Sequence, residues 1–557
     1  MKKYLMGLAI ILVAFFFRFN NLNWDSNFHL HPDERFLTMV GTAMKLPTTI
    51  NQYFDQKTSL LNPANINYEF FVYGRFPLIL TKYLAVSSSL DSYNDFTILG
   101  RQLSAFFDLL IVLFVIKTVG LLEKGLKLKS SIKYWAGFFY AIAVLPIQLS
   151  HFFAVDTFLN FFMFGSFYFA LKSSKARTSG FSVTLLSAIF FGLALACKVT
   201  TVFILPLNLF FLLKTVFYKR QSLFKTICFV LVYFLVSYFT LRLADPYIFQ
   251  INNFFNPTLS TQFLENLKQL KSFEGKDIWY PPAVQWINKP AIIFSLINLV
   301  VFGIGIPYFI LILTGIISTL ISNFKFLISK NYTLLVILLW TLVFFLYQST
   351  QFTKAMRYFI FIYPFLAIFA GIGMNFVLER IKNKKLLVIN RLLFVILFLI
   401  WPLMFSSIYF HKHTRVQASE WIYKNLPSNS VILGEYWDDP LPLSVTGNYG
   451  KQFIVEQLPV FDPDTTEKWL KMNEMLKKAD YYVLSSNRGW GSVVTVPEKY
   501  PLMSRFYEQL LSDKFSFKKI KEFKPYYYKF FQLPNSWIDE SFTVYDQPTV
   551  IILKKSI

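Results

Sequence analysis

Long apolar stretches constrain the fold of this chain more than any other feature of its sequence. They recur from residue 4 to residue 409, and a run of roughly 17–25 apolar residues crosses a bilayer as a helix. Of the 557 residues, 55% are hydrophobic and only 16% are charged, whereas soluble domains carry about 25% charged residues. The sequence therefore predicts an α-helical polytopic membrane protein with about eleven transmembrane helices. The predicted spans are residues 4–19, 102–122, 134–149, 153–172, 181–197, 199–217, 224–243, 298–320, 331–348, 358–378 and 389–409.

Basic residues in alternate loops indicate how these helices are oriented. Lys2 and Lys3 precede the first span, and further Lys and Arg residues gather after spans two, four, six, eight and ten. Because cytoplasmic loops carry an excess of Lys and Arg, the N-terminus is predicted to be cytoplasmic. The net charge of +23 then reflects topology and contact with anionic membrane lipids, and we expect no nucleic-acid binding. No small-residue cleavage site follows the first span, so we expect a retained anchor and a multi-pass protein of the cell membrane.

The composition changes after the last predicted span. Beyond it, a helical pattern alternates with short strand-like runs, which is typical of a small α/β domain. An odd number of spans places this domain on the extracytoplasmic face. We therefore divide the chain into a transmembrane domain, residues 1–410, and an extracytoplasmic domain, residues 411–557. The helical pattern and the strand-like runs cover residues 415–425, 430–433, 481–484 and 549–553.

Acidic side chains stand at the outward ends of several predicted spans. Asp33 and Glu34 follow the first span. Asp156 lies at the top of the fourth span, and Asp245 ends the seventh. Carboxylates are costly near lipid and tend to be kept there for a function. Structural interpretations remain, because Asp33 can cap a helix and Asp245 can form a turn before a proline. Asp156 can likewise pair with Lys198.

Basic residues accompany these carboxylates on the same face. Lys198 lies between spans five and six, and Lys354 and Arg357 lie in a loop that is predicted outside. An outer cleft of this kind suits transfer from a phosphate-linked donor, because cations can hold the phosphate while a carboxylate takes a proton from the acceptor. The alternative for Lys354 and Arg357 is that they reach from the lipid to the membrane interface.

Histidines lie near the acidic residues and raise the question of a metal ion. His29 and His31 precede Asp33, and His151 precedes Asp156. Imidazole and carboxylate groups are common ligands, so these side chains could join around a divalent cation. Their spacing matches no metal-binding motif, and whether the chain holds a metal stays open. The predicted substrate-binding residues are His31, His151, Asp245 and Tyr73.

Taken together, these features resemble the GT-C glycosyltransferases. An outer acidic pair follows the first span, a many-helix body comes next, and an outer domain ends the chain. The closest likeness is to the phospholipid-carrier-dependent branch that includes protein O-mannosyltransferases and aminoarabinose transferases. The chain lacks an Asp-X-Asp in the first outer loop and a Trp-Trp-Asp in the outer domain, which disfavours N-glycosylation. The stretches that carry the likeness are residues 33–34, 100–108, 148–157 and 435–442.

The resemblance implies transfer of a sugar from a polyprenyl-phosphate carrier to a lipid, glycan or protein acceptor on the outer face. Asp33 would act as base or orient the acceptor hydroxyl, with Glu34 and Asp156 in support. Cations near the leaving phosphate would lower the barrier, because that group gains charge in the transition state. These phosphate contacts would come from Lys354, Arg357 and Lys198.

Two alternatives stay open at this point. A transporter or flippase of lipid-linked glycans would line its pathway with the intramembrane charges, although no repeated pair of broken helices is visible. A polysaccharide ligase, which joins two lipid-linked glycans, would share the outer cleft and need a larger acceptor groove. No motif of nucleophilic Ser or Cys catalysis and no phosphate-binding Gly-rich loop is present.

Overall fold

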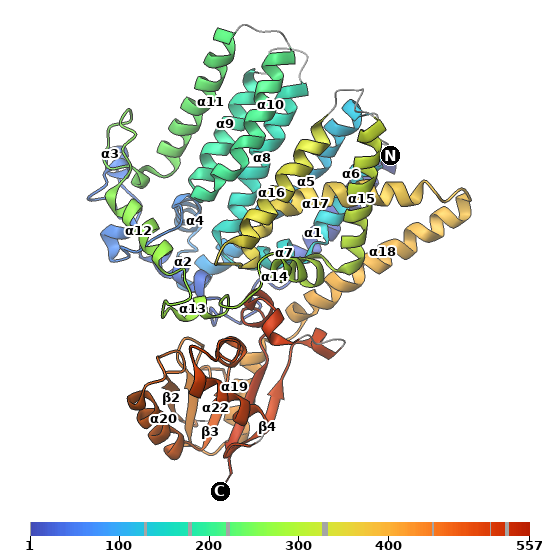
Figure 1. Ribbon diagram of the computed structural model, residues 1–557. Coiled ribbons are helices and arrows are strands. Elements are labelled where there is room, and N and C mark those ends of the chain that lie inside the picture. The colour runs from blue at the N-terminus through green and yellow to red at the C-terminus, as the bar shows by residue number, and fades with distance from the viewer. Residues whose placement is uncertain are drawn as a thin grey trace.

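The structure is a computed structural model with two parts (Figure 1). A large helical part is followed by a smaller C-terminal part that packs at one end of the helices, near α2, α13 and α14. Residue 331, the first of the ninth predicted span, lies outside the described residues. The structure describes residues 2–126, 131–175, 181–218, 223–325, 332–447, 450–512, 514–529 and 534–556.

Helices coincide with every predicted span over the described residues. Short 3-10 or π segments interrupt them at η1 (Pro63–Ile66), η2 (Val199–Ile204), η3 (Pro246–Ile248), η4 (Asn298–Ile304), η5 (Met356–Ile362) and η6 (Ser407–Phe410). The α-helices are α1 (Lys2–Phe19), α2 (Pro32–Ala43), α3 (Ile50–Phe54), α4 (Phe76–Ser87), α5 (Tyr93–Leu126), α6 (Ile132–Ala141), α7 (Val144–Ser150), α8 (Val155–Lys175), α9 (Phe181–Leu195), α10 (Leu205–Tyr218), α11 (Leu223–Ala244), α12 (Thr261–Ser272), α13 (Pro281–Val284), α14 (Ile293–Ile297), α15 (Ile306–Lys325), α16 (Thr333–Thr350), α17 (Tyr363–Leu378) and α18 (Lys384–Ser406).

Several of these helices are long and apolar enough to cross a membrane, so the chain is a polytopic membrane protein. Among the described residues, five helices qualify singly, and two bent pairs bring the total to as many as seven. Four shorter apolar helices accompany them. The count of about eleven spans therefore stays a prediction. The five single helices are Tyr93–Glu123, Thr226–Ala244, Thr333–Thr350, Met356–Leu378 and Lys385–Asn425. The bent pairs are Ile132–Ala141 with Val144–Ser150 and Ile293–Ile304 with Ile306–Ile321.

Helix α8 forms the buried centre of the helical part. It packs against α5, α9 and α10, and nearly all of its residues are buried, including Phe158 and Phe167. A helix that is apolar on all sides is typical of such a central position. The first turn of α8 carries Asp156, which is thereby held in a rigid element.

The C-terminal part contains a five-stranded sheet with the strand order β2-β1-β3-β5-β4. Strand β1 runs parallel to β2 and β3, whereas β5 runs antiparallel to β3 and β4. This confirms the predicted α/β composition. The strands are β1 (Val431–Glu435), β2 (Ile454–Leu458), β3 (Tyr481–Leu484), β4 (Phe517–Phe523) and β5 (Val550–Lys555). The helices are α19 (Thr414–Asn425), α20 (Thr466–Lys478), α21 (Arg488–Val493), α22 (Pro501–Leu511) and α23 (Glu540–Thr543), with η7 (Tyr526–Lys529) and η8 (Asn535–Trp537) between them.

The segment around α23 returns to the helical part and packs into it. Phe542 stacks on Phe302 of η4 with ring centres 5.2 Å apart. Asn298, also in η4, accepts a hydrogen bond from the Asp539 backbone at 2.9 Å and donates one to the Trp537 carbonyl at 3.0 Å. The two parts therefore share a buried contact, and the division at residue 410 stays a prediction.

Candidate active site

Asp33 and Arg357 form an ion pair where the two parts of the chain meet. Asp33 lies in the first turn of α2, and its Oδ2 accepts a hydrogen bond from Arg357 Nη1 in η5. The hydroxyl of Tyr73 donates to Asp33 Oδ1 at 3.4 Å. The Asp33 and Arg357 side chains are 28% and 20% exposed, so a ligand can reach both.

Local sequence explains why α2 begins just before this carboxylate. His31 is the N-cap, since its Nδ1 accepts a hydrogen bond from the Glu34 backbone at 3.3 Å, and Pro32 takes the first helical position. Acidic residues in the first turn, such as Asp33, interact favourably with the helix dipole. His31 therefore has the capping role that the structural interpretation gave to Asp33.

Opposing effects set the pKa of Asp33. Burial raises it, but the Arg357 guanidinium, His31 and Lys198 together lower it more, so the pKa lies below its ordinary value of 3.8. Asp33 is therefore a carboxylate at neutral pH. It can accept a hydrogen bond from a substrate hydroxyl on the side that Arg357 leaves free.

Lys198 and Asp156 form a second ion pair beside the first. Lys198 Nζ lies 3.4 Å from Asp156 Oδ1, and their side chains are 14% and 2% exposed. Lys198 Nζ also lies 4.5 Å from the centre of the Tyr358 ring, and the guanidinium carbon of Arg357 lies 5.4 Å from that centre. The ring of Tyr358 thus brings together the cations of both pairs. Asp156 therefore forms the ion pair with Lys198 that the sequence analysis gave as its structural alternative.

The segment that carries Tyr73 is fixed by backbone contact with the segment that carries Lys198. The Gly74 N–H donates to the Cys197 carbonyl at 2.9 Å. A Cβ atom at position 74 would lie 2.0 Å from the carbonyl oxygen of Ala196, so only glycine permits this approach. The contact sets the position of Tyr73 relative to Lys198.

Asp245 is buried behind this contact rather than facing Asp33. Its Oδ2 accepts from the Arg75 backbone at 2.9 Å, and Arg75 Nη1 lies 3.4 Å from its Oδ1. Both side chains are at most 4% exposed. The pair anchors the residue that follows Gly74 and so supports the position of the site.

Glu34 points away from Asp33 into a buried ion cluster. Arg101 Nε donates to Glu34 Oε2 at 2.9 Å, Arg101 Nη2 donates to Glu34 Oε1, and the Phe153 backbone donates to Oε2 at 2.7 Å. Arg101 also binds Asp25 through two hydrogen bonds of 3.1 and 2.8 Å. This cluster ties α2 to α5 and to the loop before α8.

The histidines occupy structural positions around the site. His151 is buried and stacks on Tyr409 with ring centres 3.7 Å apart, and its ring nitrogens lie 2.8 and 3.0 Å from two backbone carbonyls. His29 contacts Asn94 and Thr97 of α5. His31 is packed between two aromatic rings, and burial lowers its pKa to about 3, so it is neutral.

Lys354 lies at the edge of the site, just before η5. It is 6% exposed, its Nζ donates to the Phe352 carbonyl at 3.2 Å, and burial lowers its pKa. No hydrogen bond or ion pair joins it to Asp33 within the part of the chain that the structure describes. The cations gathered around Asp33 are therefore Arg357 and Lys198.

The C-terminal part and the outer loops add residues that the sequence analysis missed. These residues are Tyr280, Arg488 and Tyr545. Both tyrosines lie close enough to Asp33, Arg357 and Arg488 for these three charges to act on their hydroxyl groups. Burial, followed by the Asp33 carboxylate, raises the pKa of Tyr280.

No group of three or more His, Cys, Asp or Glu side chains converges to hold a metal ion in the described ranges. Asp33 faces the Arg357 guanidinium instead, and His31 uses its Nδ1 to cap α2. The residues proposed as ligands from the sequence are thus engaged elsewhere.

Solved structures of other proteins have a similar fold. The oligosaccharyltransferase of Archaeoglobus fulgidus, solved with Zn and sulfate, is 14% identical over 90% of this chain and 71% of that chain, with a TM-score of 0.53. The chain has a GT-C fold. The oligosaccharyltransferase AglB from Archaeoglobus fulgidus, in complex with an inhibitory peptide and a dolichol-phosphate, gives 13% identity over 94% and 74% of the two chains and a TM-score of 0.51. ArnT from Cupriavidus metallidurans gives 12% identity over 99% and 97% and a TM-score of 0.46. No family model and no curated protein matches the sequence.

Proposed function

We propose that the chain is a membrane glycosyltransferase that moves a sugar from a polyprenyl-phosphate carrier to an acceptor on the outer face. The observation that carries the proposal is the Asp33–Arg357 pair, an accessible carboxylate beside a cation at the junction of the two parts. One structure with the same fold, the archaeal oligosaccharyltransferase, holds a dolichol-phosphate, which supports a carrier-linked donor.

Asp33 would receive the hydroxyl group of the acceptor. The acceptor oxygen attacks the anomeric carbon of the donor sugar, and the bond from that carbon to the phosphate oxygen breaks. Its electron pair leaves with the polyprenyl phosphate, and the hydroxyl proton passes to Asp33. A carboxylate at this point also stabilises the positive charge that develops on the sugar in the transition state. A single displacement of this kind inverts the anomeric centre.

Arg357 and Lys198 would bind the phosphate that leaves. Both cations lie against the Tyr358 ring, and each retains one carboxylate neighbour, Asp33 or Asp156. Charge builds on the phosphate as the sugar departs, so these cations stabilise the transition state more than the ground state. Lys354 would add to the positive electrostatic potential at the phosphate from a longer distance.

The remaining residues expected from the sequence would position this machinery. Glu34 fixes α2 through Arg101, and His31 caps the same helix. Asp245 fixes the segment of Tyr73 through Arg75, and His151 fixes the loop before α8. These side chains already have other partners, so they would not hold a metal ion.

The orientation proposed from the basic loops places the N-terminus in the cytoplasm. The C-terminal part and Asp33 then lie on the extracytoplasmic side, where the headgroup of a carrier-linked sugar is presented. Labelling of a cysteine introduced at exposed Asp277 by a membrane-impermeant reagent on intact cells would test this. Labelling only after the cells are opened would contradict the orientation.

The function is tested with membranes that contain the full chain. They are incubated with radiolabelled polyprenyl-phosphate sugars, one sugar at a time, and the label that moves to a new product is counted. We expect transfer from one of these donors and a loss of about 100-fold or more in Asp33→Asn, as for removal of a general base. The matched control, Asp277→Asn, changes an exposed aspartate of another outer loop and should keep full activity.

Full activity in Asp33→Asn would overturn the assignment of Asp33. Transfer from none of the donors, together with movement of a lipid-linked glycan across vesicles containing the protein, would favour the transporter alternative.

A further inference from the structure

An aromatic wall, made by the rings of Tyr280, Tyr436 and Trp437, lies beside the candidate active site. Tyr436 and Trp437 directly follow β1, and they are 56% and 41% exposed. The centre of the Tyr280 ring, from the segment between α12 and α13, lies 5.9 Å from that of the Trp437 ring, and the two ring planes meet at 81°. The wall thus joins the helical part to the C-terminal part and leaves aromatic surface open to solvent.

One ion pair places this wall next to Asp33. Arg35 Nη2 donates to Asp439 Oδ1 at 2.6 Å. Arg35 follows Asp33 by two residues in α2, and Asp439 follows Trp437 by two residues. Tyr280 lies close enough to Asp33 for the charge of the carboxylate to act on its hydroxyl. A molecule that rests on the wall can therefore reach the accessible carboxylate of Asp33.

The backbone of Trp437 has a conformation that a tryptophan rarely adopts. Its φ is +79°, in the left-handed region that favours glycine. The Asp438 N–H donates to the Glu435 carbonyl at 3.2 Å, so Trp437 takes the third position of a turn in which glycine is usual. Backbone strain of this kind gathers at functional sites. The chain thus keeps an exposed tryptophan where stability alone favours glycine.

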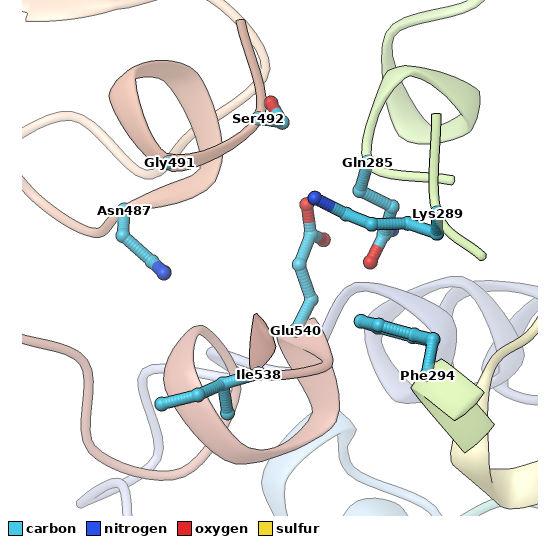
Figure 2. A pocket seen from close by; sticks show the side chains of 8 residues that line it. All are labelled: Gln285, Lys289, Phe294, Asn487, Gly491, Ser492, Ile538 and Glu540. Carbon is cyan, nitrogen blue, oxygen red and sulfur yellow. The ribbon is translucent and has the colours of Figure 1, made fainter. Parts of the chain in front are cut away.

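Polar contacts hold this turn in place. Arg488 Nη1 donates to the Trp437 carbonyl at 2.6 Å. Arg415 Nη2 donates to Asp438 Oδ1, also at 2.6 Å. Arg488 is itself held by Glu540, which lies in a recess between the two parts (Figure 2). This recess has about 20 Å³ of space, room for about one water molecule, so the junction is closely packed. The Trp437 ring is therefore displayed on a firmly held turn.

The surroundings of the wall indicate what it binds. The cations Arg357 and Arg488 lie near Tyr280, so a cationic ligand would meet like charges. Tyr280 and Trp437 offer flat apolar faces at nearly a right angle, and each ring also carries a polar group, a hydroxyl or an indole N–H. A pyranose ring matches this surface, because its C–H bonds form an apolar face and its hydroxyl groups form a polar edge.

We propose that the aromatic wall binds a pyranose ring, which packs on the faces of Trp437 and Tyr280 and turns a hydroxyl toward Asp33. A donor sugar and a glycan acceptor present the same ring chemistry. The part of this ring in transfer rests on the proposed transferase function, whereas its binding does not.

The binding is tested with the full chain in detergent and a set of neutral methyl glycosides as probes. Saturation-transfer NMR reports which glycoside binds and how tightly. We expect at least one to bind, and to bind about tenfold more weakly in Trp437→Ala, as for the loss of a packed aromatic face. Trp437→Phe keeps a ring and should keep most of the binding. The matched control is Asn429→Gly, an exposed residue of the same part whose φ is also positive.

A second measurement separates binding from stability. Trp437→Gly relieves the backbone strain, whereas Trp437→Ala keeps it, so the glycine variant should unfold at the higher temperature. Both variants lack the ring and should lose the same binding. Tyr280→Ala, on another segment, should weaken binding of the same glycoside. Binding that follows the unfolding temperature and not the presence of the ring would overturn the inference.

A short-chain isoprenyl-phosphate sugar, added as a donor analogue, distinguishes the two sources of the ring. Displacement of the glycoside by this analogue assigns the wall to the donor sugar. Binding of both together assigns it to a glycan acceptor. Either result, if it depends on Trp437, supports the inference.

Three outcomes contradict the proposal. These are no glycoside binding by the natural chain, equal binding in Trp437→Ala, or binding of an acetylated aromatic peptide in place of every glycoside. Sugar binding that depends on Trp437, without transfer from any carrier-linked donor, supports the wall as a sugar site and removes the transferase. Transfer that is unchanged in Trp437→Gly, without glycoside binding, does the reverse.

Discussion

Arg35 Nη2 donates to Asp439 Oδ1 at 2.6 Å and ties the helix that carries Asp33 to the C-terminal domain. Arg35 Nε also donates to the His29 carbonyl at 2.9 Å, so its guanidinium is held at both ends. Asp439 Oδ2 in turn accepts from Arg415 of α19 at 2.8 Å. The position of the domain and the position of the candidate catalytic carboxylate are therefore coupled.

Breaking this link should slow transfer without unfolding the chain. Arg35→Gln removes one partner of a half-exposed pair, and a coupling of about 1 kcal/mol corresponds to roughly a fivefold lower kcat/KM. Asp439→Asn should have a similar effect. Initial rates of the two single variants and the double variant form the test, and the double variant should be no slower than the worse single variant. Rates that multiply would show that the two residues act independently.

The ion pair between Asp33 and Arg357 makes a pH profile informative. In the natural chain the pKa of Asp33 lies below 3.8, so transfer should stay constant as the pH falls from neutral toward that value. In Arg357→Gln, burial is no longer opposed by the guanidinium, so the pKa of Asp33 rises and the acidic limb moves to higher pH. Rates measured against pH in both chains test this shift. An unchanged acidic limb would mean that Asp33 does not control the rate.

The position of Asp33 could be predicted from the sequence, but its partner could not. An apolar run followed by acidic residues places a carboxylate at a helix end near the membrane surface, because the run needs a bilayer and the charges avoid it. Arg357 is 324 residues away in the chain, and only the tertiary fold brings it to Asp33. Arg488 and Tyr545 come from still later segments, and the tertiary fold brings them near Asp33.

The strands of the C-terminal domain also differ in whether the sequence pattern predicts them. β1, β3 and β5 form the centre of the sheet and read as apolar runs. β2 and β4 form its edges, and β4 carries three lysines with most of its residues exposed. Edge strands with lysines avoid pairing with other chains, and they lose the apolar pattern by which strands are predicted.

Glu34 and Asp33 should differ in what their substitution damages. Glu34→Gln leaves the buried Arg101 with Asp25 as its remaining carboxylate, and losing one partner of a buried pair costs about 3 kcal/mol. We expect a clearly lower unfolding temperature for this variant in detergent. Asp33→Asn, at a half-exposed site, should unfold close to the natural chain. Equal unfolding temperatures for the two variants would contradict the assignment of Glu34 as a structural anchor and Asp33 as a catalytic group.

Gly74 offers a test of the backbone contact that positions Tyr73 and Lys198. Gly74→Ala puts a methyl group where the Ala196 carbonyl oxygen now lies, so the segments must separate. We expect transfer to fall at least about tenfold, because a small misplacement of catalytic groups costs this much or more. Gly447→Ala is the control, since nothing lies within 4 Å of its added carbon, although its positive φ adds some strain. Similar rates in the two variants would show that the contact is dispensable.

Glu435 should make the stability of the C-terminal domain depend on pH. Its Oε1 accepts hydrogen bonds from Tyr482 and Tyr507, each at 2.7 Å, and burial raises its pKa to about 7. A carboxyl whose pKa is raised in the folded state stabilises that state fully below the unfolded value of about 4.5. This contribution is lost as the pH rises through about 7, and it amounts to about 3 kcal/mol.

Glu435→Gln keeps an oxygen for both tyrosines and stays neutral at every pH, so it should remove this loss. Above pH 7 the variant should be more stable than the natural chain, whereas in acid the two should be alike. Hydrogen exchange of the β3 amides, measured at several pH values and corrected for intrinsic rates, reports the local free energy of opening. Glu474→Gln, an exposed glutamate on α20, is the matched control and should follow the natural chain. A stability difference that is the same at acid and alkaline pH would show that Glu435 does not titrate during unfolding.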